Sequence, residues 1–114
     1  MKAAFHTLGC KVNSYETQAM QEQFRKEGFE ITDFSDFSDV YVINTCSVTQ
    51  IAAQKSRQML HRARKLNPEA LIVATGCYAQ EEAEKLSGDE AVDLVVGNNL
   101  KGRIVKLVKD AIET

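Results

Sequence analysis

Three cysteines, Cys10, Cys46 and Cys77, are the residues whose type and spacing suggest chemistry in this chain. Each lies just past a short run of apolar and β-branched residues of the kind that forms a buried parallel strand. The runs are KAAFHT (2–7), YVINT (41–45) and LIVAT (71–75). Residues that follow such strands lie where open α/β sheets bind ligands, so the pattern predicts that the three thiols share one edge of a sheet.

The separations between the cysteines favour a ligand site that is assembled by the fold. They are 46 − 10 = 36 and 77 − 46 = 31 residues, too long for a local zinc knuckle. Three thiolates without a nearby fourth ligand suit a site with one open position, and soft sulfur ligands select zinc or an iron–sulfur cluster. A four-iron cluster normally takes four cysteines, so with three it keeps one iron open. Gly9 and Gly76, each directly before a cysteine, either let the backbone approach a bulky ligand or merely turn the chain.

Other chemistries of such loops fail on particular residues. A cysteine phosphatase needs an arginine where Glu16 stands, and a receiver domain needs an aspartate where Asn44 and Thr45 end their strand. The loop LGCKVN is a poor flavin phosphate loop, and no CxxC pair is present for dithiol redox chemistry. The remaining alternative is that the cysteines are structural and behave as small buried hydrophobic residues.

Composition is that of one ordinary globular domain. The chain has 114 residues, 44% hydrophobic and 26% charged, with a net charge of −2 that gives no general case for binding nucleic acid. No apolar run approaches the ~20 residues of a membrane helix, and the N-terminus lacks the pattern of a signal peptide. An odd, widely spaced set of cysteines without an export signal predicts reduced thiols and a cytoplasmic location.

Alternating strand and helix patterns predict an α/β fold. We expect strands at 2–7, 29–34, 40–45, 70–75 and 92–96, and helices at 15–27, 51–66, 80–86 and 100–112. This order predicts a five-stranded parallel sheet, in the flavodoxin-like order 2-1-3-4-5, with helices on both faces. The strands before the three cysteines are then neighbours ~4.8 Å apart, so their loops meet within about 10 Å.

Several residues have local structural interpretations. Asn13 or Ser14 is expected to cap the first helix, and Gly28 to end it. His6 and His61 are interpreted as packing or solvated residues and not as ligands. The basic side chains of the second long helix are interpreted as a solvated face in preference to a phosphate-binding surface, and they are Lys55, Arg57, Arg62, Arg64 and Lys65.

Three cysteine-centred motifs carry a resemblance to a known family. TLGCKVNSYET (7–17), INTCSVT (43–49) with KSRQ (55–58), and ATGCYAQ (74–80) resemble the N-terminal domain of the radical S-adenosylmethionine methylthiotransferases. VVGNN (95–99) matches the last strand-to-helix turn of that domain, so the resemblance covers essentially the whole chain. TLGCKVN is most similar to the branch that inserts a methylthio group at C2 of threonylcarbamoyladenosine 37 in tRNA.

The resemblance implies that Cys10, Cys46 and Cys77 bind an auxiliary [4Fe-4S] cluster with one open iron. It also implies that S-adenosylmethionine and a second [4Fe-4S] cluster belong to a radical domain, whose CxxxCxxC motif these residues lack. We therefore expect residues 1–114 to be the N-terminal domain alone, without the radical and C-terminal RNA-binding domains. Its partners would be the radical domain in cis and tRNA through the full-length transferase, and the fragment alone would be inactive.

The competing hypothesis is a flavodoxin-like binding module with structural cysteines. Binding of iron and sulfide separates the two hypotheses. The sequence leaves open whether Asn13, Asn44 and Gln80, which lie in or beside the motifs, cap helices or contact substrate.

Overall fold

The computed structural model describes residues 2–7, 11–32, 34, 37–45, 50–76, 92–96 and 103–113, and the structural statements below concern these residues. Within them, no helix combines the length and the apolar character that crossing a membrane requires.

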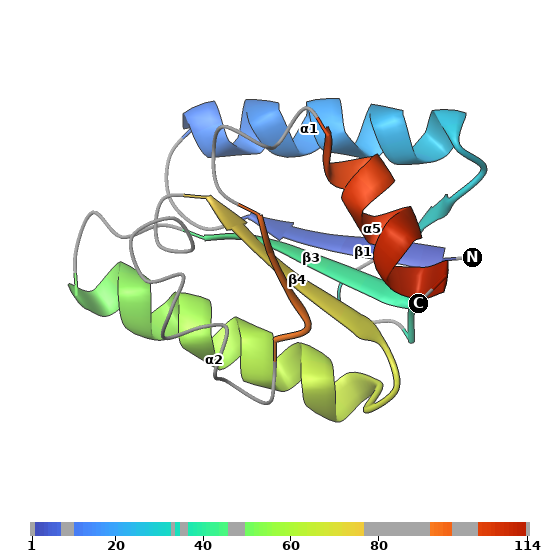
Figure 1. Ribbon diagram of the computed structural model, residues 1–114. Helices are drawn as coiled ribbons and strands as arrows, with labels where there is room; N and C mark the ends of the chain where they lie inside the picture. The colour runs from blue at the N-terminus through green and yellow to red at the C-terminus, as the bar shows by residue number, and fades with distance from the viewer. Residues whose placement is uncertain are drawn as a thin grey trace.

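Five parallel strands form one sheet, in the predicted order β2-β1-β3-β4-β5 (Figure 1). The strands are β1 (Lys2–Thr7), β2 (Glu30–Thr32), β3 (Val40–Thr45), β4 (Leu71–Gly76) and β5 (Leu94–Val96). The central strand β3 is buried along its whole length, as its continuous apolar sequence predicts for a strand covered on both faces.

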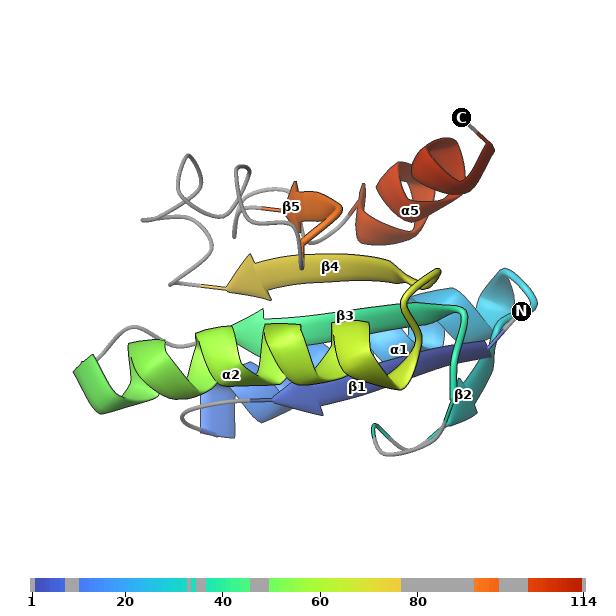
Figure 2. The ribbon, with the colours of Figure 1, turned by 90° about the horizontal axis from the view of Figure 1, so that it is seen from below.

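Helices cover both faces of the sheet, as predicted. Helices α1 (Lys11–Lys26) and α5 (Ile104–Glu113) lie on one face, and α2 (Gln50–Leu66) lies on the other (Figures 1 and 2). The helix predicted at 80–86 falls outside the described residues.

The two cores follow from the alternation of side chains along each strand. In β3, Val40 and Val42 pack with α1 and α5, whereas Tyr41 and Ile43 pack with α2. Because every fully buried strand supplies both cores, a shift of one residue in its register would exchange the two sets of side chains.

The first helix begins earlier than its sequence pattern predicts. It starts at Lys11, so Asn13 and Ser14 lie inside its first turn, and the prediction that one of them caps it is wrong. Asparagine and serine are common near helix starts, so their presence indicates where a helix begins only to within a few residues. The end is as predicted: Gly28 has φ +90°, its N–H donates to Arg25 O, and Phe29 N–H donates to Phe24 O.

The two edge strands are shorter than predicted. Strand β2 pairs with β1 through only three residues, and β5 begins at Leu94 because Asp93 leaves the strand pattern. The Asp93 carboxylate accepts the Ile72 N–H at 2.9 Å, while the Asp93 N–H donates to Ile72 O at 2.9 Å. Asp93 thus pairs with the backbone N–H and C=O groups of Ile72, at a position where the apolar sequence pattern predicts that β5 has already begun.

Candidate functional site

Three strand ends that precede the cysteines lie together at one edge of the sheet. Strands β1, β3 and β4 are adjacent, all run in the same direction, and end at Thr7, Thr45 and Gly76 (Figures 1 and 2). Cys46 directly follows Thr45, and Cys77 directly follows Gly76. The predicted ligands Cys10, Cys46 and Cys77 themselves fall outside the described residues, so their coordination of a metal stays a prediction.

A polar row runs across the three strands β1, β3 and β4 at this edge. Thr7, Asn44 and Thr75 are partners in register on neighbouring strands, on the same face as the α1 and α5 core. The Thr7 hydroxyl donates to Thr17 Oγ1 of α1 at 2.7 Å, and the buried Asn44 amide donates to the same oxygen at 3.1 Å. These hydrogen bonds join the ends of β1 and β3 to the first turns of α1. They give Asn44, whose role the sequence leaves open, a structural contact within the fold.

Thr75 is the exception in this row. Its side chain is fully buried, yet Oγ1 has no hydrogen-bond partner among the described residues. The neighbouring Thr45 hydroxyl donates to the backbone oxygen of Thr75 at 2.6 Å, so it satisfies the main chain and not the side chain. A buried hydroxyl without a partner loses its hydrogen bond to water on folding, and such a group calls for a specific explanation.

Gly76 brings two strand ends into close backbone contact. Its φ is +96°, a left-handed conformation, and an added Cβ would lie 2.4 Å from Thr45 O and 2.6 Å from Asn44 Oδ1. Only glycine fits this position without displacing backbone atoms. The residue that directly precedes Cys77 is thus required to be small by its contact with β3, whereas the approach of its backbone to a bulky ligand stays a prediction.

The start of α1 adds electrostatic support at the same edge. The helix begins at the residue that follows Cys10, and its first turn contains no acidic side chain. The N–H groups of a helix start carry a partial positive charge that stabilises a nearby thiolate.

His6 lies on the α2 face of β1, one residue before the polar row. Its ring packs 5.0 Å from the ring of Phe34, measured between centroids. Burial lowers the pKa of His6 below its ordinary value of 6.5, and the positive charge of Arg62 lowers it further. His6 is therefore held neutral as a packing residue, in line with its interpretation from the sequence.

This lowered pKa predicts a pH effect on stability. The unfolded chain binds the proton at higher pH than the folded chain does, so the contribution of neutral His6 is complete above pH 6.5 and is lost as the pH falls toward the lower folded-state pKa. We expect the urea midpoint of the wild type to fall more than that of His6→Gln between pH ~7.5 and pH ~5.5. Equal slopes for the two proteins would contradict this account of His6.

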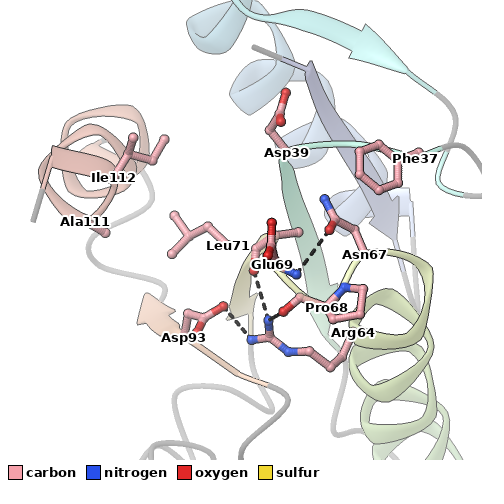
Figure 3. Close-up of a pocket in the computed structure, with 11 residues that line it drawn as sticks. Phe37, Asp39, Arg64, Asn67, Pro68, Glu69, Leu71, Asp93, Ala111 and Ile112 are labelled. Atoms are coloured by element: carbon pink, nitrogen blue, oxygen red, sulfur yellow. Dashed lines mark hydrogen bonds and ion pairs between the residues drawn. The ribbon is translucent and has the colours of Figure 1, made fainter.

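A cavity of about 540 Å³ lies at the opposite edge, where β3 and β4 begin (Figure 3). The Arg64 guanidinium reaches along it and donates to Pro68 O at 2.7 Å, to Ala70 O at 3.1 Å and to the Asp93 carboxylate at 2.6 Å. Arg64 was interpreted from the sequence as part of a solvated face, which is wrong, because these partners bind it between α2 and the sheet. The hydrogen bonds of Arg64 are therefore made within the fold. The cavity lies away from the edge of the sheet that leads to the cysteines.

The surroundings of the candidate site suit a soft, electron-rich group. By sequence, a cysteine follows each of the three strand ends, and thiolates select zinc or iron–sulfur clusters. The start of α1 favours the thiolate form of the cysteine that precedes it, and Gly76 keeps the ends of β3 and β4 close together. The unpaired Thr75 hydroxyl is a donor available to an acceptor such as sulfur. Among the described residues, no three His, Cys, Asp or Glu side chains form a metal site elsewhere.

Comparison with known proteins gives one family and a consistent set of relatives. The model of the uncharacterized protein family UPF0004 matches residues 2–97. The chain is 45% identical over 113 residues to threonylcarbamoyladenosine tRNA methylthiotransferase MtaB of Aquifex aeolicus, covering 99% of the chain and 28% of the relative. It is 52% identical over 94 residues to MtaB of Bacillus subtilis, covering 82% and 21%. It is 36% identical over 107 residues to tRNA-2-methylthio-N(6)-dimethylallyladenosine synthase of Jannaschia sp., covering 90% and 23%.

These findings confirm the resemblance to methylthiotransferases that the three motifs predict. The relatives are named for two different modified adenosines, and the two MtaB proteins are more similar to the chain than the Jannaschia protein is. The chain spans between 21% and 28% of the length of these three relatives.

Proposed function

Because the chain belongs to the uncharacterized protein family UPF0004 and is similar along its length to tRNA methylthiotransferases, we propose that it binds an auxiliary [4Fe-4S] cluster through Cys10, Cys46 and Cys77. The observation that carries this proposal is the adjacency of the three strand ends. Thr7 pairs with Asn44, and Thr45 pairs with Gly76, so the chain enters all three cysteine segments from one edge.

The chain's own residues have distinct roles in this proposal. The cluster, when bound by three thiolates, supplies one iron that is open to a further ligand. The start of α1 stabilises the Cys10 thiolate, and Gly76 lets β4 lie against β3 where the chain continues into Cys77. Thr17 joins Thr7 to Asn44 and keeps two of the three strand ends aligned.

The activity proposed for the full-length protein is that of a tRNA methylthiotransferase. Its product is a methylthio group at C2 of threonylcarbamoyladenosine 37. This assignment is supported by the MtaB proteins of Aquifex aeolicus and Bacillus subtilis, which are named for that nucleoside and are 45% and 52% identical to the chain. S-adenosylmethionine and a second [4Fe-4S] cluster act in a radical domain of the same protein, with tRNA as substrate and the cytoplasm as location. The present residues contain only three cysteines, all used by the auxiliary cluster, so on their own they are inactive.

Anaerobic reconstitution of the chain with ferrous iron and sulfide tests the proposal. We expect about four irons per chain, with the broad visible absorption of an iron–sulfur cluster. Cys46→Ala removes one of three ligands and is expected to abolish most of this iron. Lys65→Ala, an exposed substitution near the end of α2 and outside the three motifs, is the control and should bind iron as the wild type does.

The contrary result is equally specific. A wild-type chain that binds no iron, and whose stability is unchanged by Cys46→Ala, would indicate a flavodoxin-like binding module with structural cysteines. The strand order alone is compatible with that alternative.

A further inference from the structure

On β1, β3 and β4, the last layer of side chains on the α1 and α5 face is polar, whereas the layer before it is apolar. Val96 of β5, in register with Thr75, stays apolar. Phe5, Val42 and Val73 are partners in register on β1, β3 and β4 and belong to the α1 and α5 core. Two residues further along the same strands, Thr7, Asn44 and Thr75 take their places. Buried polar groups at the end of an apolar core are costly unless each has a partner.

Two members of this row are satisfied within the fold. Thr7 and Asn44 both donate to Thr17 Oγ1, at 2.7 Å and 3.1 Å. Thr75 Oγ1 instead has no partner among the described residues, although the side chain is as buried as any in the core. Valine has the same shape as threonine and suits a buried strand, so the fold by itself gives no reason for a hydroxyl here.

We infer that the Thr75 hydroxyl donates a hydrogen bond to a sulfur atom of the cluster or of its cysteine ligands. The inference rests on the proposed function and goes beyond it, because it assigns a residue that controls the electron affinity of the cluster. Thr75 stands two residues before Cys77 on a strand whose end is clamped to β3 at Gly76. A hydroxyl on so rigid a strand is preorganised as a donor.

A hydrogen bond of this kind has a defined electrostatic consequence. Reduction adds one negative charge to the cluster, and a donor to sulfur stabilises the more negative form. The Thr75 hydroxyl therefore raises the reduction potential. In the absence of cluster the same hydroxyl is unpaired and lowers the stability of the chain.

Thr75→Val tests both consequences because they have opposite signs. Without cluster, the variant is expected to have a higher urea midpoint than the wild type, since a buried unpaired hydroxyl becomes a methyl group. With cluster, it should bind as much iron as the wild type but show a more negative reduction potential. The potential is measured by anaerobic dithionite titration followed by electron paramagnetic resonance.

Matched variants separate the hydroxyl from other effects of substitution. Thr75→Ser keeps the hydroxyl and should restore the wild-type potential, while Thr75→Ala should lower the potential as valine does and offers a second test if the valine variant folds poorly. Thr32→Val, in the edge strand β2, removes a hydroxyl bonded to Ser38 far from the cysteine edge and should leave the potential unchanged.

The outcomes distinguish this inference from the proposed function. If the wild type binds about four irons and neither Thr75→Val nor Thr75→Ala changes the potential, the inference is overturned and cluster binding stands. If the wild type binds no iron, both are overturned together. A potential that falls equally in Thr75→Ser would show that packing, and not the hydroxyl, is responsible.

Discussion

Gly76→Ala is expected to destabilise the chain by about 2–5 kcal/mol, combining the cost of a left-handed non-glycine residue with that of overpacking. The glycine has φ +96°, and an added Cβ would lie 2.4 Å from Thr45 O, 2.6 Å from Asn44 Oδ1 and 2.8 Å from Thr45 N. Two of these atoms belong to the backbone of β3, so relief requires β3 and β4 to move apart. Urea unfolding of the variant without cluster measures the loss.

Gly28→Ala is the matched control, because it shares the conformation and lacks the crowding. Gly28 has φ +90°, but an added Cβ would meet no atom within 4 Å. We expect it to cost only the conformational part, about 1–2 kcal/mol. If the two alanine variants lose the same free energy of unfolding, close contact between the ends of β3 and β4 is not what requires glycine at position 76.

Gly76→Ala should also weaken cluster binding, whereas Gly28→Ala should not. Cys77 directly follows Gly76, and any separation of β4 from β3 moves the start of that segment away from Cys46. The iron content after reconstitution is the second measurement. It distinguishes a local effect at the cysteine edge from a general loss of stability.

Phe24→Ala is expected to cost about 3–5 kcal/mol, the range for removing a fully buried aromatic side chain. Phe24 has no exposed surface and lies in the core between α1 and the sheet. Its ring meets those of Phe5 and Phe29 edge to face, with centroids 5.1 Å and 5.0 Å away. The substitution thus removes two aromatic contacts and leaves a cavity, and the urea midpoint should fall accordingly.

Tyr15→Ala on the same helix provides the comparison. Tyr15 is 76% exposed, so truncation removes little buried surface and is expected to change the free energy of unfolding by only ~0.5 kcal/mol. Similar losses at the two positions would mean that α1 is stabilised by its own helical tendency and not by packing on the sheet.

The order and identity of the strands could be read from local patterns. The strands expected at 2–7 and 40–45 have the observed bounds, because each is a short run with an apolar centre and polar residues at its end. Gly28 was predicted to end the first helix, and it does so with a positive φ. Right-handed crossovers then left few alternatives to the observed strand order.

Other features depended on partners far away in the chain. The local patterns did not predict the start of α1 at Lys11, the departure of Asp93 from its strand or the bonding of the Arg64 guanidinium to the sheet. Two of these features, those of Asp93 and Arg64, are states that partners distant in the sequence stabilise. For Arg64 and Asp93 these partners are each other, 29 residues apart.

By itself, the sequence determined that three thiols follow three strands and that the sheet is parallel, because periodicity and turn residues act between near neighbours. The tertiary structure alone decided which side chains meet across the strands. Thr7, Asn44 and Thr75 come into register only when β1, β3 and β4 pair, and only then does one hydroxyl of the row stay unpaired. Register and hydrogen bonding depend on the packing of the whole sheet, which no local stretch of residues encodes.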